Sequence, residues 1–150
     1  MVDELPELIL TATDGSPLPL ASLRGRPAVV YFYPKDDTSG CTKEAQDFSL
    51  LAADFTAAGV RVIGVSKDTP ASHQRFTGKH QLEVQLVSDE SGAACEAFGA
   101  WIEKSMYGKK YMGIDRSTFL FDAAGRLARV WRKVKVPGHA GEVLSAARAL

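Results

Sequence analysis

The chain has 150 residues, of which 45% are hydrophobic and 24% are charged, as in an ordinary globular domain. This composition excludes a disordered, collagen-like or coiled-coil chain, and we expect a single domain over residues 1–150. Eighteen basic and eighteen acidic side chains give no net charge, so we expect no nucleic-acid partner. The longest apolar run, at 28–33, is too short to cross a bilayer, and the N-terminus is acidic. We therefore expect a cytoplasmic protein without membrane contact.

The first half of the chain predicts strands that alternate with a helix. A turn at residues 14–17 separates two short extended pieces and indicates an N-terminal β-hairpin. Residues 28–33 form a continuous β-prone run, typical of a strand buried on both faces. After a polar loop, apolar residues recur at steps of three and four from Cys41 to Ala58, which predicts one helix. Residues 60–66 indicate a second buried strand.

The second half continues this alternation and ends in a hairpin and a helix. Thr69 followed by Pro70 is typical of a helix start. The elements expected here are a helix to about residue 80, a strand at 82–88, a short helix at 89–98, an irregular basic segment at 101–113, a hairpin of strands 117–122 and 127–133, and a helix at 138–150. This order favours an α/β, thioredoxin-like fold with a central mixed β-sheet flanked by helices.

Cys41 is the residue in this chain best placed for chemistry. It stands in the first turn of a predicted helix, where unpaired backbone N–H groups and the positive end of the helix dipole favour thiolate over thiol. Thr38 can place a hydroxyl beside the sulfur or serve as an ordinary cap or turn residue. Pro34 can simply end the strand or shield one side of the thiolate. Glu44 can face the helix dipole or orient an arginine.

The pattern Pro34-x-x-x-Thr38-x-x-Cys41 resembles the active-site signature of the peroxiredoxins. Residues 32–44 and 104–119 resemble the bacterioferritin comigratory, or Q-type, members of that family, and the resemblance extends from about residue 5 to the C-terminus. It implies a thioredoxin-like fold and a thiol peroxidase that reduces hydrogen peroxide and organic hydroperoxides.

The resemblance also implies a role for each residue of the signature. Cys41 corresponds to the peroxidatic cysteine, whose thiolate attacks a peroxide oxygen and becomes a sulfenic acid. Thr38 and Arg116 correspond to the residues that activate the sulfur and polarise the peroxide. Pro34 corresponds to the proline that shields the thiolate, and Glu44 corresponds to a carboxylate that orients the arginine. A fixed guanidinium suits this reaction, because breaking the O–O bond builds negative charge on the leaving oxygen. Arg116 begins a predicted strand that we expect beside the strand preceding the Cys41 loop.

The two resolving positions common in Q-type members do not hold cysteine here. Five residues after Cys41 stands Gln46, and the position in the following helix is Thr77. Cys95, the one other cysteine, is expected to be a small buried filler. We therefore expect a one-cysteine cycle, in which an external thiol such as thioredoxin, glutaredoxin or a small thiol reduces the sulfenic acid.

Other interpretations stay open at this point. A Cys41–Cys95 disulfide would give a two-cysteine cycle, provided that the two Cα atoms approach within about 7 Å. A sulfenic acid without a resolver could also pass its oxidation to a protein partner, as a peroxide sensor or relay does. A thioredoxin-fold binding module with an inactive site is the third alternative. Because Q-type relatives are often monomeric, we expect a monomer.

The remaining polar and apolar signals carry less information. The three histidines have no metal-ligand spacing with the cysteines, and we expect packing or surface roles for His73, His80 and His139. No nucleotide-binding motif is present, so we expect neither cofactor nor metal. The apolar residues of segment 101–113 are expected to pack locally or to line a peroxide pocket or partner contact.

Overall fold

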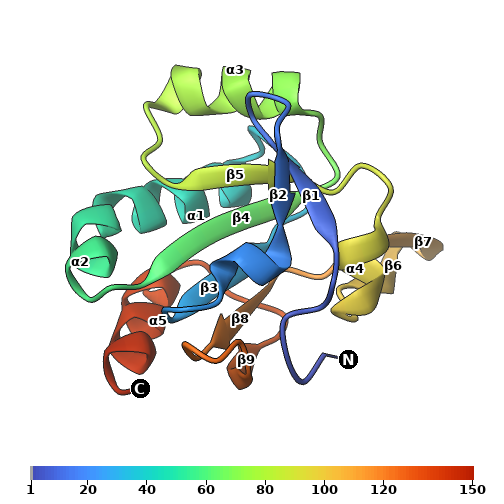
Figure 1. Cartoon of the computed structure of the whole chain (residues 1–150). Helices are drawn as coiled ribbons and strands as arrows, with labels where there is room; N and C mark the ends of the chain where they lie inside the picture. The colour runs from blue at the N-terminus through green and yellow to red at the C-terminus, as the bar shows by residue number, and fades with distance from the viewer. Residues whose placement is uncertain (1) are drawn as a thin grey trace.

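A seven-stranded sheet in the order β2-β1-β5-β4-β3-β8-β9 forms the centre of the computed structural model, which describes residues 2–150 (Figure 1). Its strands are β1 (Ile9–Ala12), β2 (Pro17–Pro19), β3 (Ala28–Phe32), β4 (Arg61–Ser66), β5 (Gln85–Ser88), β8 (Ser117–Phe121) and β9 (Leu127–Trp131). The β3–β4 and β4–β5 pairs are parallel and the others are antiparallel. The sheet is therefore mixed, as predicted.

Helices cover both faces of this sheet. They are η1 (Leu20–Leu23), α1 (Ser39–Leu50), α2 (Ala52–Ala57), α3 (Pro70–His80), α4 (Ala93–Ala97) and α5 (His139–Arg148). Buried side chains of α1, α2, α3 and α5 share one core, and those of η1 and α4 share a second core with β1 and β2. This arrangement confirms the predicted thioredoxin-like α/β fold. Within residues 2–150, none of the helices is both long and apolar enough for a transmembrane span.

Strand β3 divides the two cores and leads to the loop before α1. All five of its residues are buried, and side chains alternate between the faces: Val29 and Tyr31 lie in the core of α1, whereas Val30 and Phe32 lie in the other. The antiparallel pairing of Phe32 with Ser117 brings the start of β8 to the end of β3. The residue before Ser117 therefore lies beside the loop after β3, as expected from the sequence.

The prediction of a single helix from Cys41 to Ala58 is wrong. The helix begins two residues earlier, at Ser39, and the backbone leaves the helical region at Leu51, with φ −97° and ψ 5°. A second helix then starts at once, so the apolar stripe continues across the break. Phe48 of α1 and Phe55 of α2 enter the same core, with ring centroids 5.9 Å apart. The apolar repeat in the sequence therefore predicted the buried face correctly but did not indicate the break in the helix.

The predicted strand at 82–88 and helix at 89–98 are both shorter in the structure. The strand begins at Gln85, and α4 covers Ala93–Ala97 only. The side chain of Asp89 explains the late helix start, because its carboxylate accepts hydrogen bonds from the backbone N–H groups of Ala94 and Cys95. Asp89 thus binds the first turn of α4 from outside the helix.

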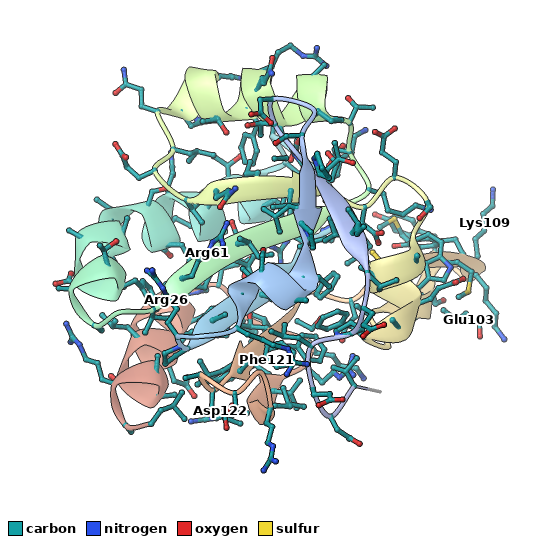
Figure 2. The ribbon with its side chains drawn as sticks, viewed as in Figure 1. Arg26, Arg61, Glu103, Lys109, Phe121 and Asp122 are labelled. Atoms are coloured by element: carbon teal, nitrogen blue, oxygen red, sulfur yellow. The ribbon has the colours of Figure 1, made fainter. Side chains whose placement is uncertain are left out.

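Residues 101–113 lie in an ordered hairpin rather than the irregular segment that we predicted. Strands β6 (Trp101–Met106) and β7 (Lys109–Ile114) pair antiparallel, outside the central sheet. Tyr107 and Gly108 at its turn have φ of 52° and 76°, as in the turns that suit two-residue hairpins. The hairpin projects beyond α4, with Glu103 and Lys109 directed into solvent (Figures 1 and 2). Its tip is exposed on both faces, so the sequence lacks the clean alternation of a half-buried strand.

Candidate active site

Cys41 is the third residue of α1 and its side chain is only 2% exposed. Thr38 precedes the helix in an extended conformation, with φ −86° and ψ 155°, and so fixes where the first turn begins. The first turn of a helix carries N–H groups without intrahelical partners. Cys41 therefore lies in the first turn of the helix, where the sequence predicted it.

Arg116 connects Cys41 to Glu44. Its Nη2 donates a hydrogen bond to the Cys41 Sγ at 3.2 Å, and its Nη1 donates to the Glu44 Oε1 at 2.7 Å. Gly40 leaves room for the guanidinium, since a Cβ at this position would lie 3.2 Å from Nη2. Three residues that the sequence singled out thus meet in one chain of contacts, with the arginine held by a carboxylate and directed at the sulfur.

Glu44 is almost fully buried, and this sets its proton affinity. Burial raises the pKa of Glu44 to about 7, although the ion pair with Arg116 opposes the rise. Its second oxygen, Oε2, and the hydroxyl of Tyr31 are both buried without a hydrogen-bond partner within residues 2–150. Tyr31 also packs closely on β4, where a Cβ at Gly64 would lie 2.6 Å from the hydroxyl oxygen. The Glu44 carboxyl can therefore gain or lose a proton near neutral pH.

We expect the Glu44→Gln variant to show a different pH dependence of stability from the wild type. The folded protein raises the pKa of Glu44 above its ordinary value of 4.5, so wild-type stability falls as pH rises from 4.5 through about 7. Between pH 5 and 8, the wild type should lose about 2 to 3 kcal/mol of unfolding free energy relative to the variant. Urea unfolding at several pH values measures this. Parallel stability curves for the two proteins would contradict it.

Thr38 and Pro34 flank the cysteine without a hydrogen bond to its sulfur. The Thr38 hydroxyl donates to the carbonyl oxygen of Lys35 at 2.8 Å, which is the turn role that its sequence position also allowed. Its oxygen retains lone pairs that can accept a further hydrogen bond. Pro34 is exposed and lies two residues after the end of β3. Their roles toward a peroxide stay predictions.

Cys95 lies in the other core. Its side chain is fully buried in α4, among the residues on the opposite face of the sheet from Cys41. Burial and the neighbouring Asp89 raise the pKa of the Cys95 thiol far above its ordinary value. A thiol in this state is a poor nucleophile, because thiolate is the reactive form. Both cysteines are free.

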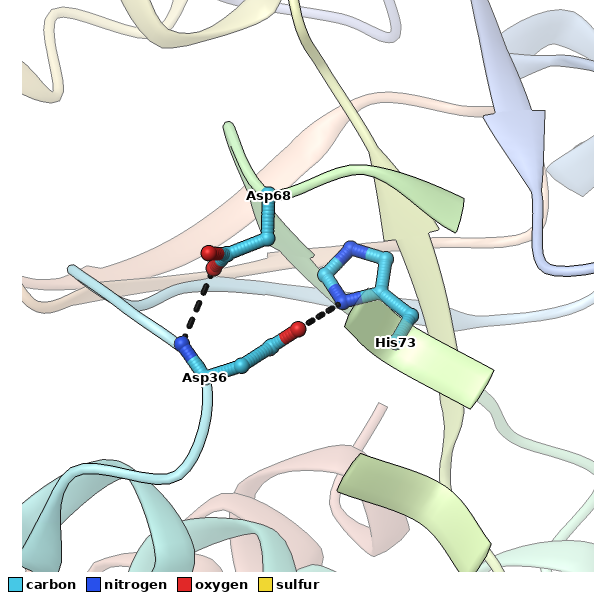
Figure 3. Close-up of side chains that lie close together, drawn as sticks. All are labelled: Asp36, Asp68 and His73. Atoms are coloured by element: carbon cyan, nitrogen blue, oxygen red, sulfur yellow. Dashed lines mark hydrogen bonds and ion pairs between the residues drawn. The ribbon is translucent and has the colours of Figure 1, made fainter. Parts of the chain in front are cut away.

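A buried polar cluster behind the active-site loop is the part of the site that sequence reasoning missed. Asp36, Asp68 and His73 have potential ligand atoms within 4.8 Å of one another (Figure 3). However, Asp36 Oδ2 is bonded to His73 Nδ1 at 2.7 Å, and Asp68 Oδ2 accepts from the Asp36 backbone N–H at 2.9 Å. The arrangement is a hydrogen-bonded network, in which these atoms already bind one another. No spacing in the sequence connects residues on three separate elements.

The other two histidines have the ordinary roles expected from the sequence. His80 bonds through Nε2 to Asp37 Oδ1 at 2.7 Å near the surface. His139 is buried, 2.8 Å from the hydroxyl of Thr118. Burial lowers the pKa of His139.

Comparison with known proteins links this geometry to one family. Residues 1–130 match the family model described as AhpC/TSA family. The putative peroxiredoxin bcp of Coxiella burnetii is 46% identical over 139 residues, covering 93% of this chain and 92% of the relative. Peroxiredoxin Bcp of Bacillus subtilis is 45% identical, with 93% and 88% covered. The Xanthomonas campestris bacterioferritin comigratory protein, whose structures were solved for insight into alkyl peroxide reduction, superposes with a TM-score of 0.92 at 45% identity, covering 99% of this chain and 97% of that one.

Proposed function

This chain belongs to the AhpC/TSA family as a peroxiredoxin of the Bcp, or Q, type, and we propose that Cys41 is its peroxidatic cysteine. As a member of this group of peroxiredoxins, it is a thiol peroxidase. The observation that carries the assignment of Cys41 is the 3.2 Å contact between its sulfur and Arg116 Nη2, at the first turn of a helix. Beside Cys95 stands instead the Asp89 carboxylate, and burial together with this carboxylate raises the pKa of the Cys95 thiol.

The proposed reaction transfers one oxygen atom to the sulfur. The Cys41 thiolate attacks an oxygen of the peroxide, the O–O bond breaks, and the sulfur is oxidised by two electrons to a sulfenic acid. The leaving oxygen takes up a proton and departs as water or an alcohol. Arg116 and the N–H groups of the first turn stabilise the charge that builds on the oxygens. Thr38 accepts a hydrogen bond from the hydroperoxide, and Pro34 shields the thiolate.

We propose hydrogen peroxide and organic hydroperoxides as the substrates, and an external thiol as the reductant. The alkyl peroxide reduction described for the Xanthomonas relative supports the organic substrates. The burial of Cys95 in the opposite core supports the external thiol, because a disulfide needs the two Cα atoms within about 7 Å. Thioredoxin, glutaredoxin or a small thiol attacks the sulfenic acid to give a mixed disulfide and water, and a second thiol then releases Cys41. A reducing compartment maintains such thiols, and no step needs a second copy of this chain, so we propose a cytoplasmic monomer.

Intact-mass measurement after one equivalent of hydrogen peroxide tests the one-cysteine cycle. Wild type and Cys95→Ser should both gain one oxygen under non-reducing conditions, because the sulfenic acid has no internal partner. Added thioredoxin or a small thiol should then restore the original mass. If the wild type instead loses two hydrogens and Cys95→Ser does not, the two cysteines form a disulfide and the one-cysteine cycle is wrong.

A further inference from the structure

We propose that His73, on helix α3, is a positioning residue for Cys41 and acts through Asp36 in the loop between β3 and α1. The inference rests on the proposed role of Cys41 and names a residue that controls where its sulfur lies. His73 is fully buried, and Asp36 is 8% exposed. Their side chains meet at 2.7 Å, Nδ1 to Oδ2, although the residues are 37 positions apart (Figure 3).

Both ring nitrogens of His73 and the Asp36 carboxylate have buried hydrogen-bond partners. His73 Nε2 lies 3.2 Å from the carbonyl oxygen of Val87. Asp36 already accepts from the hydroxyl of Tyr33 at 2.6 Å and from that of Ser72 at 2.8 Å. A hydrogen must also lie between Nδ1 and Oδ2, since a bare nitrogen and a carboxylate oxygen would repel each other.

Asp36 is the ionised member of this pair. Burial alone would raise the pKa of Asp36, but hydrogen bonds from His73, Tyr33 and Ser72 outweigh it and lower the pKa below its usual value. His73 Nδ1 therefore donates to a carboxylate. Removing His73 leaves that buried carboxylate without one of its donors, which disturbs the local structure.

The pair holds the loop that sets the start of α1. The Asp36 backbone N–H donates to Asp68, and the neighbouring Asp37, at φ 59°, binds Lys79 and His80 of α3, each at 2.7 Å. Helix α1 begins two residues after Asp37, at Ser39, and Cys41 lies in its first turn. Helix α3 therefore holds two successive loop residues just before the cysteine.

The backbone of Arg116 is anchored outside this loop. Arg116 precedes β8, and its carbonyl oxygen accepts from the backbone N–H of Val134 at 2.9 Å. Movement of the loop therefore shifts Cys41 relative to the Arg116 backbone and disturbs the 3.2 Å contact on which sulfur activation depends. A small misplacement of reacting groups is enough to lower a rate substantially.

Asp36→Asn removes the carboxylate charge and keeps the hydrogen bonds. The introduced amide nitrogen can donate to the His73 ring and to the Ser72 hydroxyl, while its oxygen accepts from Tyr33 as before. Asp36→Ala and His73→Phe remove the contact between helix α3 and the loop altogether. Gln74→Ala is a matched control, because Gln74 is exposed on the same helix and binds the carbonyl oxygen of Thr13.

We would measure the reaction of Cys41 with hydrogen peroxide and, separately, its alkylation by iodoacetamide at pH 7. His73→Phe and Asp36→Ala should slow both reactions by about ten-fold or more. Gln74→Ala should react as the wild type does, and Asp36→Asn should regain most of the rate that Asp36→Ala loses. Normal rates in a folded His73→Phe variant would overturn the proposal. If His73→Phe does not fold, Asp36→Ala takes its place, and equal rates for Asp36→Ala and Asp36→Asn would overturn the proposal.

Alkylation distinguishes this proposal from the proposed function, because it reports the state of the Cys41 sulfur without any peroxidase activity. If peroxide reduction does not depend on Cys41 but alkylation still follows His73 and Asp36 as expected, the function assignment fails and the positioning role stands. If peroxide reduction depends on Cys41 and alkylation ignores both residues, the positioning role fails alone.

Discussion

Cys41→Ser is expected to abolish thiol-dependent peroxide reduction, with a loss of at least about 10³-fold. A serine hydroxyl is not ionised near neutral pH and its oxygen cannot accept another oxygen atom to form the equivalent of a sulfenic acid. The environment of Arg116 and the first-turn N–H groups is retained in the variant but has no sulfur to act on. Peroxide consumption in the presence of excess dithiothreitol or thioredoxin measures the effect.

Cys95→Ser provides the matched comparison for this experiment. It also replaces a buried sulfur by oxygen, but in the core on the other side of the sheet. We expect it to retain peroxide reduction, provided that circular dichroism shows it to be folded. If instead Cys41→Ser keeps turnover and Cys95→Ser loses it, the assignment of the reactive cysteine is reversed.

The local part of the active site was predictable from the sequence, because it depends on neighbouring positions. A buried strand, a polar loop and a helix with cysteine in its first turn follow from residues 28–58 alone, and the structure has them in that order. The exact extent of the helix was not predictable. The break at Leu51 changes neither the apolar stripe nor the composition, so periodicity has no signal for it.

Contacts between distant residues needed more than local patterns. Arg116 lies 75 positions from Cys41, and a lone arginine before a strand is ordinarily a surface residue. The resemblance to a known signature singled it out, and the pairing of β3 with β8 explains its position. Neither the resemblance nor a strand pairing pointed to the His73–Asp36 pair, because its two residues lie on a helix and a loop that only the folded chain brings together.

Replacing Arg116 is the second change with a large expected effect. Arg116→Met should lower the rate constant of Cys41 with hydrogen peroxide by about 10² to 10³-fold, the usual cost of losing a preorganised donor at a developing charge. Arg116→Lys should recover only part of this loss. A lysine ammonium carries the charge but lacks the planar fork that holds Glu44 at 2.7 Å and Cys41 at 3.2 Å together.

A change at Arg116 also leaves Glu44 buried without its partner, so the rate loss has to be separated from a structural effect. Glu44→Gln removes the carboxylate charge and keeps an oxygen that can accept from Arg116. Comparing Arg116→Met alone with the Arg116→Met/Glu44→Gln double variant completes a double-mutant cycle. If stranded charge on Glu44 caused the loss, the double variant would regain activity. We expect it to stay as slow as Arg116→Met, because the missing contact is the one to the Cys41 sulfur. Stopped-flow rates and iodoacetamide alkylation at pH 7 decide between these results.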